Sequence, residues 1–458
     1  MLSDALLKKL RKELGQENVL TSDEELVCHS YDATLIRSLP DAVVTPRTAE
    51  DVSKVLVLAN ENAIPVTPRG SGTGLTGGSV PLRGGIVLCL TKMNSIREIA
   101  PADLLAVVEP GVVTGELQRK LEEEGLFYPP DPASLEISSI GGNIGNSAGG
   151  PRGFKYGMTK DYILGLEVVL PTGELVKTGA RTVKCVTGYD LARLFTGSEG
   201  TLGVITSAIL RLIPVPEERI TVLASFKRLE DAASLVSEAV SAGLAPSALE
   251  IMDSVTLSAV KESSGLNSPE GTSAVVLSET DGFSEVAMKE AQKVRELSIK
   301  NGAISVQMEK DKERREKLWA ARRGAFAALA RKKPTTILED IVVPRTKLVE
   351  MVRAVAEIGR RHQLVIATYG HAGDGNLHPT ILCDKRDEDE MRRAGSAAGE
   401  IFERALDLGG TLSGEHGIGF EKARFLKKEI GEAGIKIMKR LKDSFDPKGI
   451  MNPGKMFE

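Results

Sequence analysis

Apolar positions in the first 216 residues alternate between the spacing of short helices and that of strands. Residues 1–30 predict two short helices, the first with leucines at helical spacing and charges between them. Residues 42–70 predict a strand, a helix that opens at Thr48 or Glu50, and a second strand. Further runs rich in Val, Ile and Leu predict strands at 85–90, 105–112, 165–178 and 203–216.

The pattern changes at Pro214 and Pro216. Because proline interrupts regular structure, we place a domain boundary there. Residues 217–410 then alternate strand and helix, which predicts an α+β domain, and residues 445–457 predict mostly loop. A chain of 458 residues exceeds one compact core, so two or three domains are expected.

Composition excludes several classes of protein. The formal net charge is −4, from 59 basic and 63 acidic residues spread along the chain, which argues against a nucleic-acid partner. The four cysteines lie far apart, so we expect neither a disulfide framework nor a cysteine zinc site, and a reduced cytoplasmic location fits. No run reaches the roughly 18 apolar residues of a membrane span, so any membrane contact should be peripheral, through a partner subunit.

Glycine is in excess, with 46 of 458 residues, against roughly 7% in average proteins. The glycines cluster at 70–85, 141–157, 197–203, 370–375 and 409–419. Since glycine permits sharp turns and close backbone approach, these clusters are candidate sites.

The first cluster contains G-x-G-x-x-G, from Gly72 to Gly77. A Rossmann fingerprint must lead into a helix, whereas here Gly78, Pro81 and Gly84 follow, which break helices. We therefore expect a nest of backbone N–H groups around a phosphate, with charge added by Arg69. The alternative is a long surface turn without a ligand.

Two further glycine-rich segments, residues 138–157 and 196–206, are interpreted as loops. Their Asn and Ser side chains can satisfy a polar ligand. Three such loops in one domain favour a large, flat cofactor that carries phosphate, and FAD is such a cofactor.

Three of the five histidines, His371, His378 and His416, lie in glycine-rich sequence near the C-terminus. A G-D-G-N turn separates the first two between predicted strands, so it can bring both imidazoles to one point. With Glu415 they form a set that suits Zn or Mn and leaves positions open for substrate. Since an unperturbed imidazole has a pKa of about 6.5, His416 could instead accept a substrate proton. The alternative is that each histidine is structural.

Arg322 and Arg323, beside the only tryptophan, are candidates for binding a substrate carboxylate. The alternative is two solvated arginines on an amphipathic helix.

Residues 40–215 resemble the FAD-binding domain of the vanillyl-alcohol oxidase superfamily. The resemblance rests on PRGSGTGLTGG, PPDPAS, SIGGNIGNSAGG, YGMTKDYILGLEVVLPTGE and TGSEGTLGVIT. It implies FAD held by Arg69, Gly70, Ser71, Gly72, Thr73, Gly74, Gly77, Gly78, Ser79, Pro132, Ser139, Ile140, Gly141, Gly142, Asn143, Asn146, Gly149, Gly150, Val204, Ile205 and Asn452. Some relatives attach FAD through a histidine in the first loop, where this chain has Ser71 and Thr73, so non-covalent FAD is expected.

The C-terminal half resembles FAD-linked oxidases that include D-lactate dehydrogenase, D-2-hydroxyglutarate dehydrogenase and the D subunit of glycolate oxidase. W-A-x-R, E-D-x-x-V-P, G-H-x-G-D-G-N-x-H and G-E-H-G-I-G carry the resemblance. It implies His371, His378 and Glu415 as metal ligands, His416 as base, Arg322 as carboxylate anchor, and Asn376 facing substrate. The hydroxyglutarate enzymes have a lysine near the position of Leu338 and Glu339, so a monocarboxylic substrate is favoured.

The expected fold is α+β. An FAD-binding domain of two α+β subdomains, 1–216 with its core at 40–215, is followed by an α+β substrate (cap) domain with an antiparallel sheet, 217–410. Residues 411–458 are expected to return to the first domain and complete the active site.

The expected reaction is oxidation of D-lactate or glycolate to the 2-oxo acid, with hydride transfer to flavin N5. The electrons would pass to an external acceptor, such as an electron-transfer flavoprotein or an iron–sulfur subunit, and a homodimer is compatible with the sequence. One alternative is a D-2-hydroxyglutarate-type dehydrogenase, and another is a flavin subunit that only relays electrons. The ether-lipid synthase branch differs because it carries a run of adjacent histidines that this chain lacks.

Overall fold

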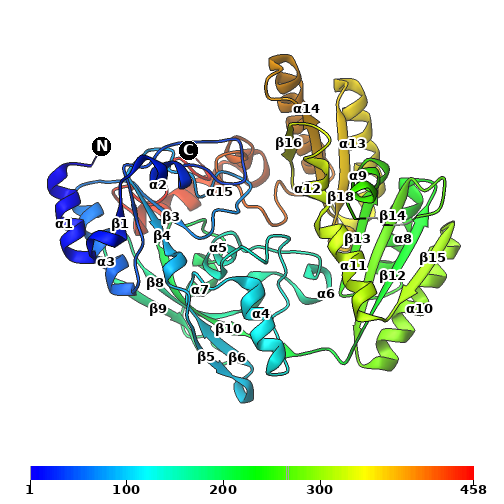
Figure 1. Cartoon of the computed structure of the whole chain (residues 1–458), viewed down its shortest axis with the longest axis horizontal. Coiled ribbons are helices and arrows are strands. Elements are labelled where there is room, and N and C mark those ends of the chain that lie inside the picture. Colours follow the sequence, from blue (N-terminus) through cyan, green and yellow to red (C-terminus); the bar gives the residue numbers. More distant parts are fainter. Residues whose placement is uncertain (1, 265, 267, 458) are drawn as a thin grey trace. The chain divides into compact units, whose positions relative to one another are not determined.

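The computed structural model describes residues 2–264, 266 and 268–457. The chain forms two compact units. Unit 1 comprises Met1–Gly149, Met158–Val215 and Glu415–Glu458, and unit 2 comprises Gly150–Gly157 and Pro216–Gly414. Each unit therefore combines segments that are distant in the sequence (Figure 1).

Unit 1 contains three sheets. The first has the order β1-β2-β4-β3, with β2, β4 and β3 parallel, in strands Val19–Leu20 (β1), Ala42–Val44 (β2), Val66–Arg69 (β3) and Ile86–Cys89 (β4). The second is antiparallel with the order β5-β6-β10-β8-β9, in strands Ile96–Ala100 (β5), Leu105–Val108 (β6), Ile163–Val169 (β8), Leu175–Gly179 (β9) and Val204–Arg211 (β10). Leu126–Phe127 (β7) pairs with Ile213–Pro214 (β11).

The helices of unit 1 are Asp4–Leu14 (α1), Asp23–Cys28 (α2), Ala49–Glu61 (α3), Thr114–Glu123 (α4), Ile140–Asn146 (α5), Leu191–Phe195 (α7) and Ala423–Phe445 (α15). Short 3-10 turns lie at Gln16–Asn18, Leu90–Lys92, Pro101–Asp103 and Thr159–Tyr162. Helix α3 begins as predicted because the Thr48 hydroxyl accepts a hydrogen bond from the backbone N–H of Asp51 at 3.1 Å.

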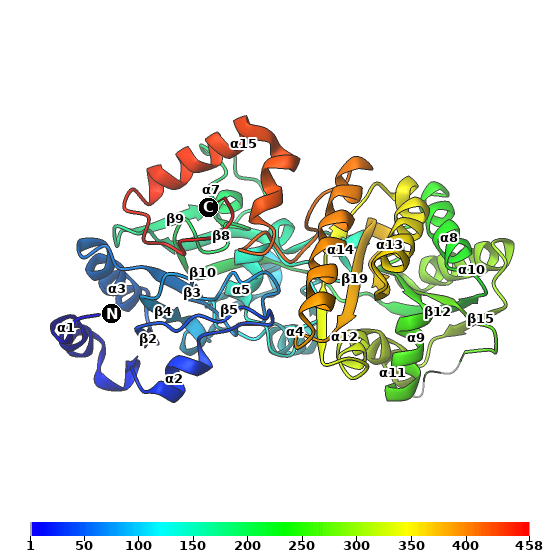
Figure 2. The same ribbon diagram turned by 90° about the horizontal axis from the view of Figure 1, so that it is seen from above.

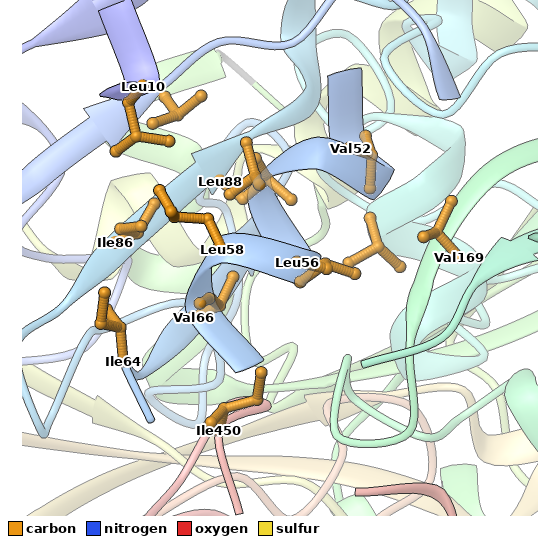
Figure 3. Close-up of a cluster of buried hydrophobic side chains, with 14 of the residues drawn as sticks. Leu10, Val52, Leu56, Leu58, Ile64, Val66, Ile86, Leu88, Val169 and Ile450 are labelled. Carbon is orange, nitrogen blue, oxygen red and sulfur yellow. The ribbon is translucent and has the colours of Figure 1, made fainter. Parts of the chain in front are cut away.

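The apolar face of α3 packs on the first sheet and forms a core of unit 1 (Figure 3). Val52 and Leu56 of the helix are buried there with Leu88 of the sheet. The C-terminal segment joins this core, because the Val66 N–H donates to the carbonyl of Ile450 at 2.8 Å and Ile450 is 1% exposed. The last residues of the chain thus extend the edge of the first sheet beside β3.

Unit 2 is built on an antiparallel sheet of eight strands with the order β15-β12-β14-β13-β18-β19-β16, and β17 also pairs with β19. The strands are Glu218–Phe226 (β12), Ala248–Asp253 (β13), Ala274–Gly282 (β14), Ser305–Glu309 (β15), Thr335–Leu338 (β16), Ile341–Val342 (β17), Val365–Gly370 (β18) and Asn376–Cys383 (β19). The α+β fold with an antiparallel sheet in the second part of the chain is confirmed.

The helices of unit 2 are Gly153–Tyr156 (α6), Leu229–Ser241 (α8), Ser254–Ser264 (α9), Ser284–Lys300 (α10), Lys312–Arg323 (α11), Ala325–Leu329 (α12), Leu348–His362 (α13) and Glu388–Asp407 (α14), with 3-10 turns at Arg345–Lys347 and Ala372–Asp374. Figure 2 shows α8, α10 and α13 on one face of the sheet and α9, α11 and α12 on the other. Alternate residues of β12 serve both faces: Ile220 and Val222 pack with α10, whereas Leu223 packs with α9 and α12.

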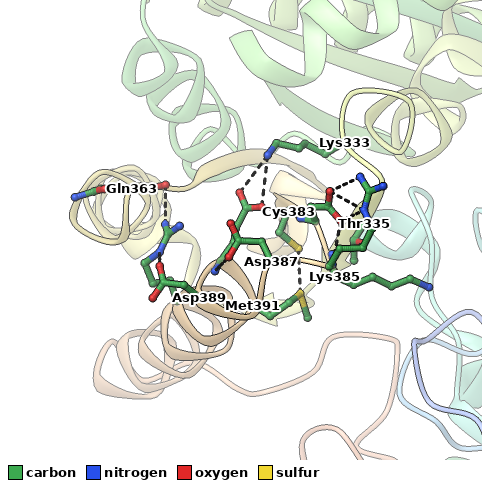
Figure 4. Close-up of polar contacts among 12 residues, drawn as sticks. Lys333, Thr335, Gln363, Cys383, Lys385, Asp387, Asp389 and Met391 are labelled. Carbon is green, nitrogen blue, oxygen red and sulfur yellow. Dashed lines mark hydrogen bonds and ion pairs between the residues drawn. The ribbon is translucent and has the colours of Figure 1, made fainter.

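Polar contacts join the sheet of unit 2 to the start of α14 (Figure 4). Lys333 donates to a carboxylate oxygen of Glu390 at 3.2 Å, and the backbone N–H of Lys385 donates to the Thr335 hydroxyl at 3.1 Å. These contacts hold the start of α14 against β16 and the end of β19. Among the described residues, no helix has both the length and the apolar character that a membrane span requires.

One prediction about local structure is wrong. Residues 138–157 were expected to be loop, but α5 and α6 form there. The Ser139 hydroxyl caps α5 by accepting the N–H of Gly142 at 3.3 Å, and Ile140 and Ile144 are fully buried. Capping and burial outweigh the poor helix propensity of the glycines.

Candidate functional site

The first glycine loop folds without a helix, as predicted: residues 70–85 contain only turns and bends. Arg69, which directly precedes the loop, is buried, and its side chain contacts the loop. The guanidinium donates to the carbonyl of Tyr31 at 2.8 Å and to the Ser79 hydroxyl at 3.3 Å. Gly72 has a left-handed φ of 73°, and an added Cβ there would lie 2.0 Å from this guanidinium, so the loop favours glycine at this position. Arg69 thus connects Ser79 of the loop with Tyr31.

The first loop and the start of α5 lie against each other. An added Cβ on Gly70 would be 2.2 Å from the Ser139 hydroxyl, which leaves no room for a side chain. In contrast, an added Cβ on Gly78 or Gly145 would meet nothing within 4 Å, so these glycines face open space. The open space beside these two glycines fits the close approach of a nucleotide cofactor to the backbone.

The remaining predicted cofactor residues are spread over several elements. Unit 1 carries them in the first loop (Ser71, Thr73, Gly74, Gly77 and Ser79), in or after α5 (Gly141, Gly142, Asn143, Asn146 and Gly149), at Pro132, in β10 (Val204 and Ile205) and at Asn452. Gly150 is the first residue of the short segment that belongs to unit 2.

Asn452 joins two of the glycine segments. Its amide nitrogen donates to the carbonyls of Gly78 and Glu199, both at 2.8 Å. The C-terminal loop therefore fixes the first loop and the turn of residues 197–200 relative to each other.

His416 is held by the backbone of the same region. Its carbonyl oxygen accepts hydrogen bonds from the Thr76 hydroxyl at 3.2 Å and from the Asn146 amide at 3.3 Å. The side chain of Glu415 lies beside Gly149, since an added Cβ there would be 2.9 Å from the Glu415 carboxylate. The Glu415-His416 pair thus lies among residues predicted to contact FAD.

Glu199 anchors the turn that follows His416. Its carboxylate accepts the backbone N–H groups of Ile418 and Gly419, both at 2.7 Å, and Glu199 itself has a left-handed φ of 52°. Burial raises the pKa of this carboxyl, although the two N–H groups oppose the shift. Sequence reasoning missed Glu199, and its only signal was a carboxylate set between glycines.

The two histidines of unit 2 meet as the predicted turn requires. His371 follows β18 and His378 lies in β19, and the two buried rings have centroids 5.1 Å apart at an interplanar angle of 86°. The nitrogens that could bind a metal lie within 4.8 Å of each other. Two imidazoles at this separation fit a divalent metal of the Zn or Mn type.

A buried carboxylate connects His371 with Arg322. Glu250, in β13, is 0% exposed; its Oε1 lies 2.6 Å from His371 Nδ1 and its Oε2 lies 2.5 Å from an Arg322 nitrogen. Burial acts to raise the pKa of Glu250, but Arg322 and His371 outweigh it and the pKa is lowered. Sequence reasoning missed Glu250, whose signal was a single charge within the apolar run ALEIM.

The structure distinguishes the two candidate arginines. Arg322 is 4% exposed and its guanidinium lies 4.8 Å from the ring centroid of Tyr369, whereas Arg323 is exposed and pairs with Glu316 at 3.3 Å. The Nε of Arg322 is buried and has no hydrogen-bond partner among the described residues. A buried, unsatisfied N–H of this kind is costly, and a carboxylate ligand would satisfy it.

The side chain of Asn376 forms hydrogen bonds within unit 2. Its amide nitrogen donates to the Asp340 carboxylate at 2.7 Å and to the carbonyl of Ile341 at 2.8 Å. Asp340 also accepts the Ser413 hydroxyl at 2.7 Å and the N–H of Gly414 at 2.9 Å. Asn376 and Asp340 therefore fix the chain directly before Glu415, and a contact of Asn376 with substrate stays a prediction.

This combination of glycine loops, paired histidines and a buried arginine is that of a flavin-linked oxidoreductase, and comparison with known proteins agrees. Residues 215–456 match the FAD linked oxidases, C-terminal domain, and residues 40–179 match an FAD binding domain. The chain belongs to the FAD-linked oxidases.

The chain is 47% identical over 458 residues to glycolate oxidase subunit GlcD of Bacillus subtilis, covering 100% of this chain and 97% of the relative. It is 35% identical to glycolate oxidase subunit GlcD of Escherichia coli K12, with 98% of this chain and 90% of the relative covered. It is 36% identical to D-lactate dehydrogenase of Anaerostipes hadrus, with 97% of this chain and 96% of the relative covered.

Solved structures share the fold at low identity. p-Cresol methylhydroxylase with substrate bound aligns with a TM-score of 0.81 at 20% identity, covering 99% of this chain and 97% of that one. Alkyldihydroxyacetonephosphate synthase aligns with a TM-score of 0.78 at 19% identity, covering 99% and 85%. These likenesses show a shared fold. The match of residues 40–179 to an FAD binding domain confirms the prediction of FAD.

Proposed function

We propose that this chain oxidises a small 2-hydroxy acid, D-lactate or glycolate, to the corresponding 2-oxo acid. The observation that carries the proposal is the buried Arg322, which has an unsatisfied Nε and is linked through Glu250 to His371. A cation that can bind a carboxylate is thus linked to an imidazole that can hold a metal, which supports recognition of a 2-hydroxy acid. The printed names of the relatives, glycolate oxidase subunit and D-lactate dehydrogenase, support the same substrate class.

Each residue has a proposed role. Arg322 binds the carboxylate, while His371, His378 and Glu415 hold the metal. Bound FAD would supply the hydride acceptor, and a bound divalent metal, Zn or Mn, would supply a Lewis acid that lowers the pKa of the substrate hydroxyl. His416 takes the hydroxyl proton, and the hydrogen bonds to its carbonyl from Thr76 and Asn146 keep its segment in place.

The proposal extends to the route of the electrons. Because two of the relatives are named as subunits, we propose that a separate protein, an electron-transfer flavoprotein or an iron–sulfur subunit, reoxidises the flavin. A monocarboxylic substrate is favoured over 2-hydroxyglutarate, since Leu338 and Glu339 offer no cation for a second carboxylate.

Anaerobic titration of the flavin-loaded chain with a panel of D- and L-2-hydroxy acids tests the proposal. D-Lactate or glycolate should bleach the flavin absorbance at low concentration, and L-lactate and D-2-hydroxyglutarate should require far more. Preferential bleaching by D-2-hydroxyglutarate, or by no acid in the panel, would reject this substrate class.

A further inference from the structure

We propose that Glu250 is a positioning residue that couples the metal site to the carboxylate anchor; this inference rests on the proposed function. One carboxylate contacts both groups: Oε1 lies 2.6 Å from His371 Nδ1, and Oε2 lies 2.5 Å from a terminal nitrogen of Arg322. The contact with His371 is a charge-assisted hydrogen bond, and the contact with Arg322 is a close ion pair.

The contact with His371 fixes which ring nitrogen carries the proton. An arginine is always protonated, so the carboxylate beside it is ionised and can only accept hydrogen bonds. His371 Nδ1 therefore carries the hydrogen and donates it to Glu250, which leaves Nε2 with the lone pair that a metal needs. Outer carboxylates of this type orient a ligating imidazole and increase its basicity.

The contact with Glu250 also holds Arg322, the proposed carboxylate anchor, in position. Arg322 lies in the last turn of α11 and Glu250 lies in β13, so the pair ties a helix on one face of the sheet to the sheet itself. The Tyr369 ring, 4.8 Å from the guanidinium, limits its movement further. With one terminal nitrogen engaged by Glu250, Nε remains available for the substrate carboxylate.

One residue thus sets the separation between the two groups that would bind the carboxylate and the hydroxyl of one substrate. Moving either contact should affect both metal binding and carboxylate binding, which a purely structural residue would not do. Glu279 provides a matched control, because it is a buried carboxylate in the neighbouring strand β14 that pairs with Arg315 at 3.4 Å.

The test uses flavin-loaded chain freed of metal, in the wild type and in Glu250→Ala, Glu250→Gln and Glu279→Gln. Mn²⁺ binding is measured by electron paramagnetic resonance, and binding of oxalate, as a carboxylate probe, by perturbation of the flavin spectrum. In Glu250→Ala we expect a 10- to 100-fold higher Kd for Mn²⁺. Glu279→Gln should bind Mn²⁺ and oxalate as the wild type does.

Glu250→Gln keeps the shape but cannot accept from both donors, because its amide nitrogen is itself a donor. We expect the Kd of Mn²⁺ and the Kd of oxalate both to rise about tenfold, and this variant suffices where Glu250→Ala does not fold. A wild-type value for either probe in Glu250→Gln would overturn the inference alone. A wild-type chain that binds no Mn²⁺ would overturn the proposed metal site as well.

Discussion

The carboxylate of Glu199 accepts the backbone N–H of Ile418 at 2.7 Å, across 219 residues of sequence. The next N–H, of Gly419, binds the other carboxylate oxygen at the same distance. An added Cβ on Gly417 would lie 2.8 Å from Glu199, so the turn after His416 is shaped around this side chain. Glu199 therefore determines where the proposed catalytic base lies.

Replacing Glu199 should impair catalysis more than cofactor binding. Glu199→Gln retains one acceptor but places an amide N–H against a backbone N–H, so the turn must move. We expect kcat to fall about 10- to 100-fold with KM changed little, since displacement by about 1 Å costs this much. FAD content and steady-state kinetics provide the measurement. Glu109→Gln is the control, because Glu109 is also buried in unit 1 and pairs with Arg97 at 2.9 Å; an equal loss there would exclude a specific role for Glu199.

Arg322→Lys should raise KM for D-lactate or glycolate. Lysine keeps the charge that Glu250 needs but loses the planar, bidentate geometry. A weakened charge-assisted hydrogen bond corresponds to about 1.5 kcal/mol, or roughly tenfold in KM. Arg323→Lys should leave KM unchanged because Arg323 is exposed. Equal KM values in the two variants would contradict the assignment of Arg322.

Removing metal should abolish activity without releasing flavin. After dialysis against a chelator, we expect hydroxy-acid oxidation to be lost, the flavin absorbance to remain, and Zn²⁺ or Mn²⁺ to restore turnover. His371→Ala should lower the metal content, whereas His362→Ala should not, because His362 pairs with Glu400 at 2.8 Å in a contact that joins α13 to α14. Activity that survives complete chelation would refute a catalytic metal.

Asp253 should make unit 2 less stable as pH rises from about 4 to about 6. Burial raises the pKa of Asp253 to about 6, although hydrogen bonds from Thr256 and from the Thr368 N–H oppose the shift. Since the unfolded carboxyl has a pKa of about 3.9, the folded state binds the extra proton in this window. Stability is greatest below the unfolded pKa and is lost as pH rises through the folded pKa.

Urea unfolding followed by the fluorescence of Trp319, the only tryptophan, measures this effect in unit 2. Between pH 4.5 and pH 7 the free energy of unfolding should fall about 2 kcal/mol more in the wild type than in Asp253→Asn. Parallel pH profiles for the two proteins would show that the pKa of Asp253 is not raised.

The sequence predicted those features that depend on neighbouring residues. The strand, helix and strand at 42–70 formed because Thr48 caps the helix and the apolar period matches its buried face. The meeting of His371 and His378 followed from a short turn between two strands, and the register pairs Tyr369 with His378. Local spacing was sufficient in both cases.

Features that depend on distant residues could not be predicted in this way. Glu250 reaches His371 across 121 residues, and Glu199 reaches Ile418 across 219, so no spacing along the chain reveals either contact. Helix α5 was missed because glycine propensity argues against it, and burial of Ile140 and Ile144 becomes visible only in the folded unit. Both missed carboxylates lie beside predicted site residues.

Rapid anaerobic mixing of the flavin-loaded, metal-loaded chain with D-lactate or glycolate tests most directly that this chain itself oxidises a 2-hydroxy acid. The flavin band should bleach within single turnover in the wild type, and His416→Ala should retain FAD but reduce it at a rate lower by a factor of about 10² to 10⁴. Absence of bleaching in the wild type, or wild-type bleaching in His416→Ala, would contradict the account.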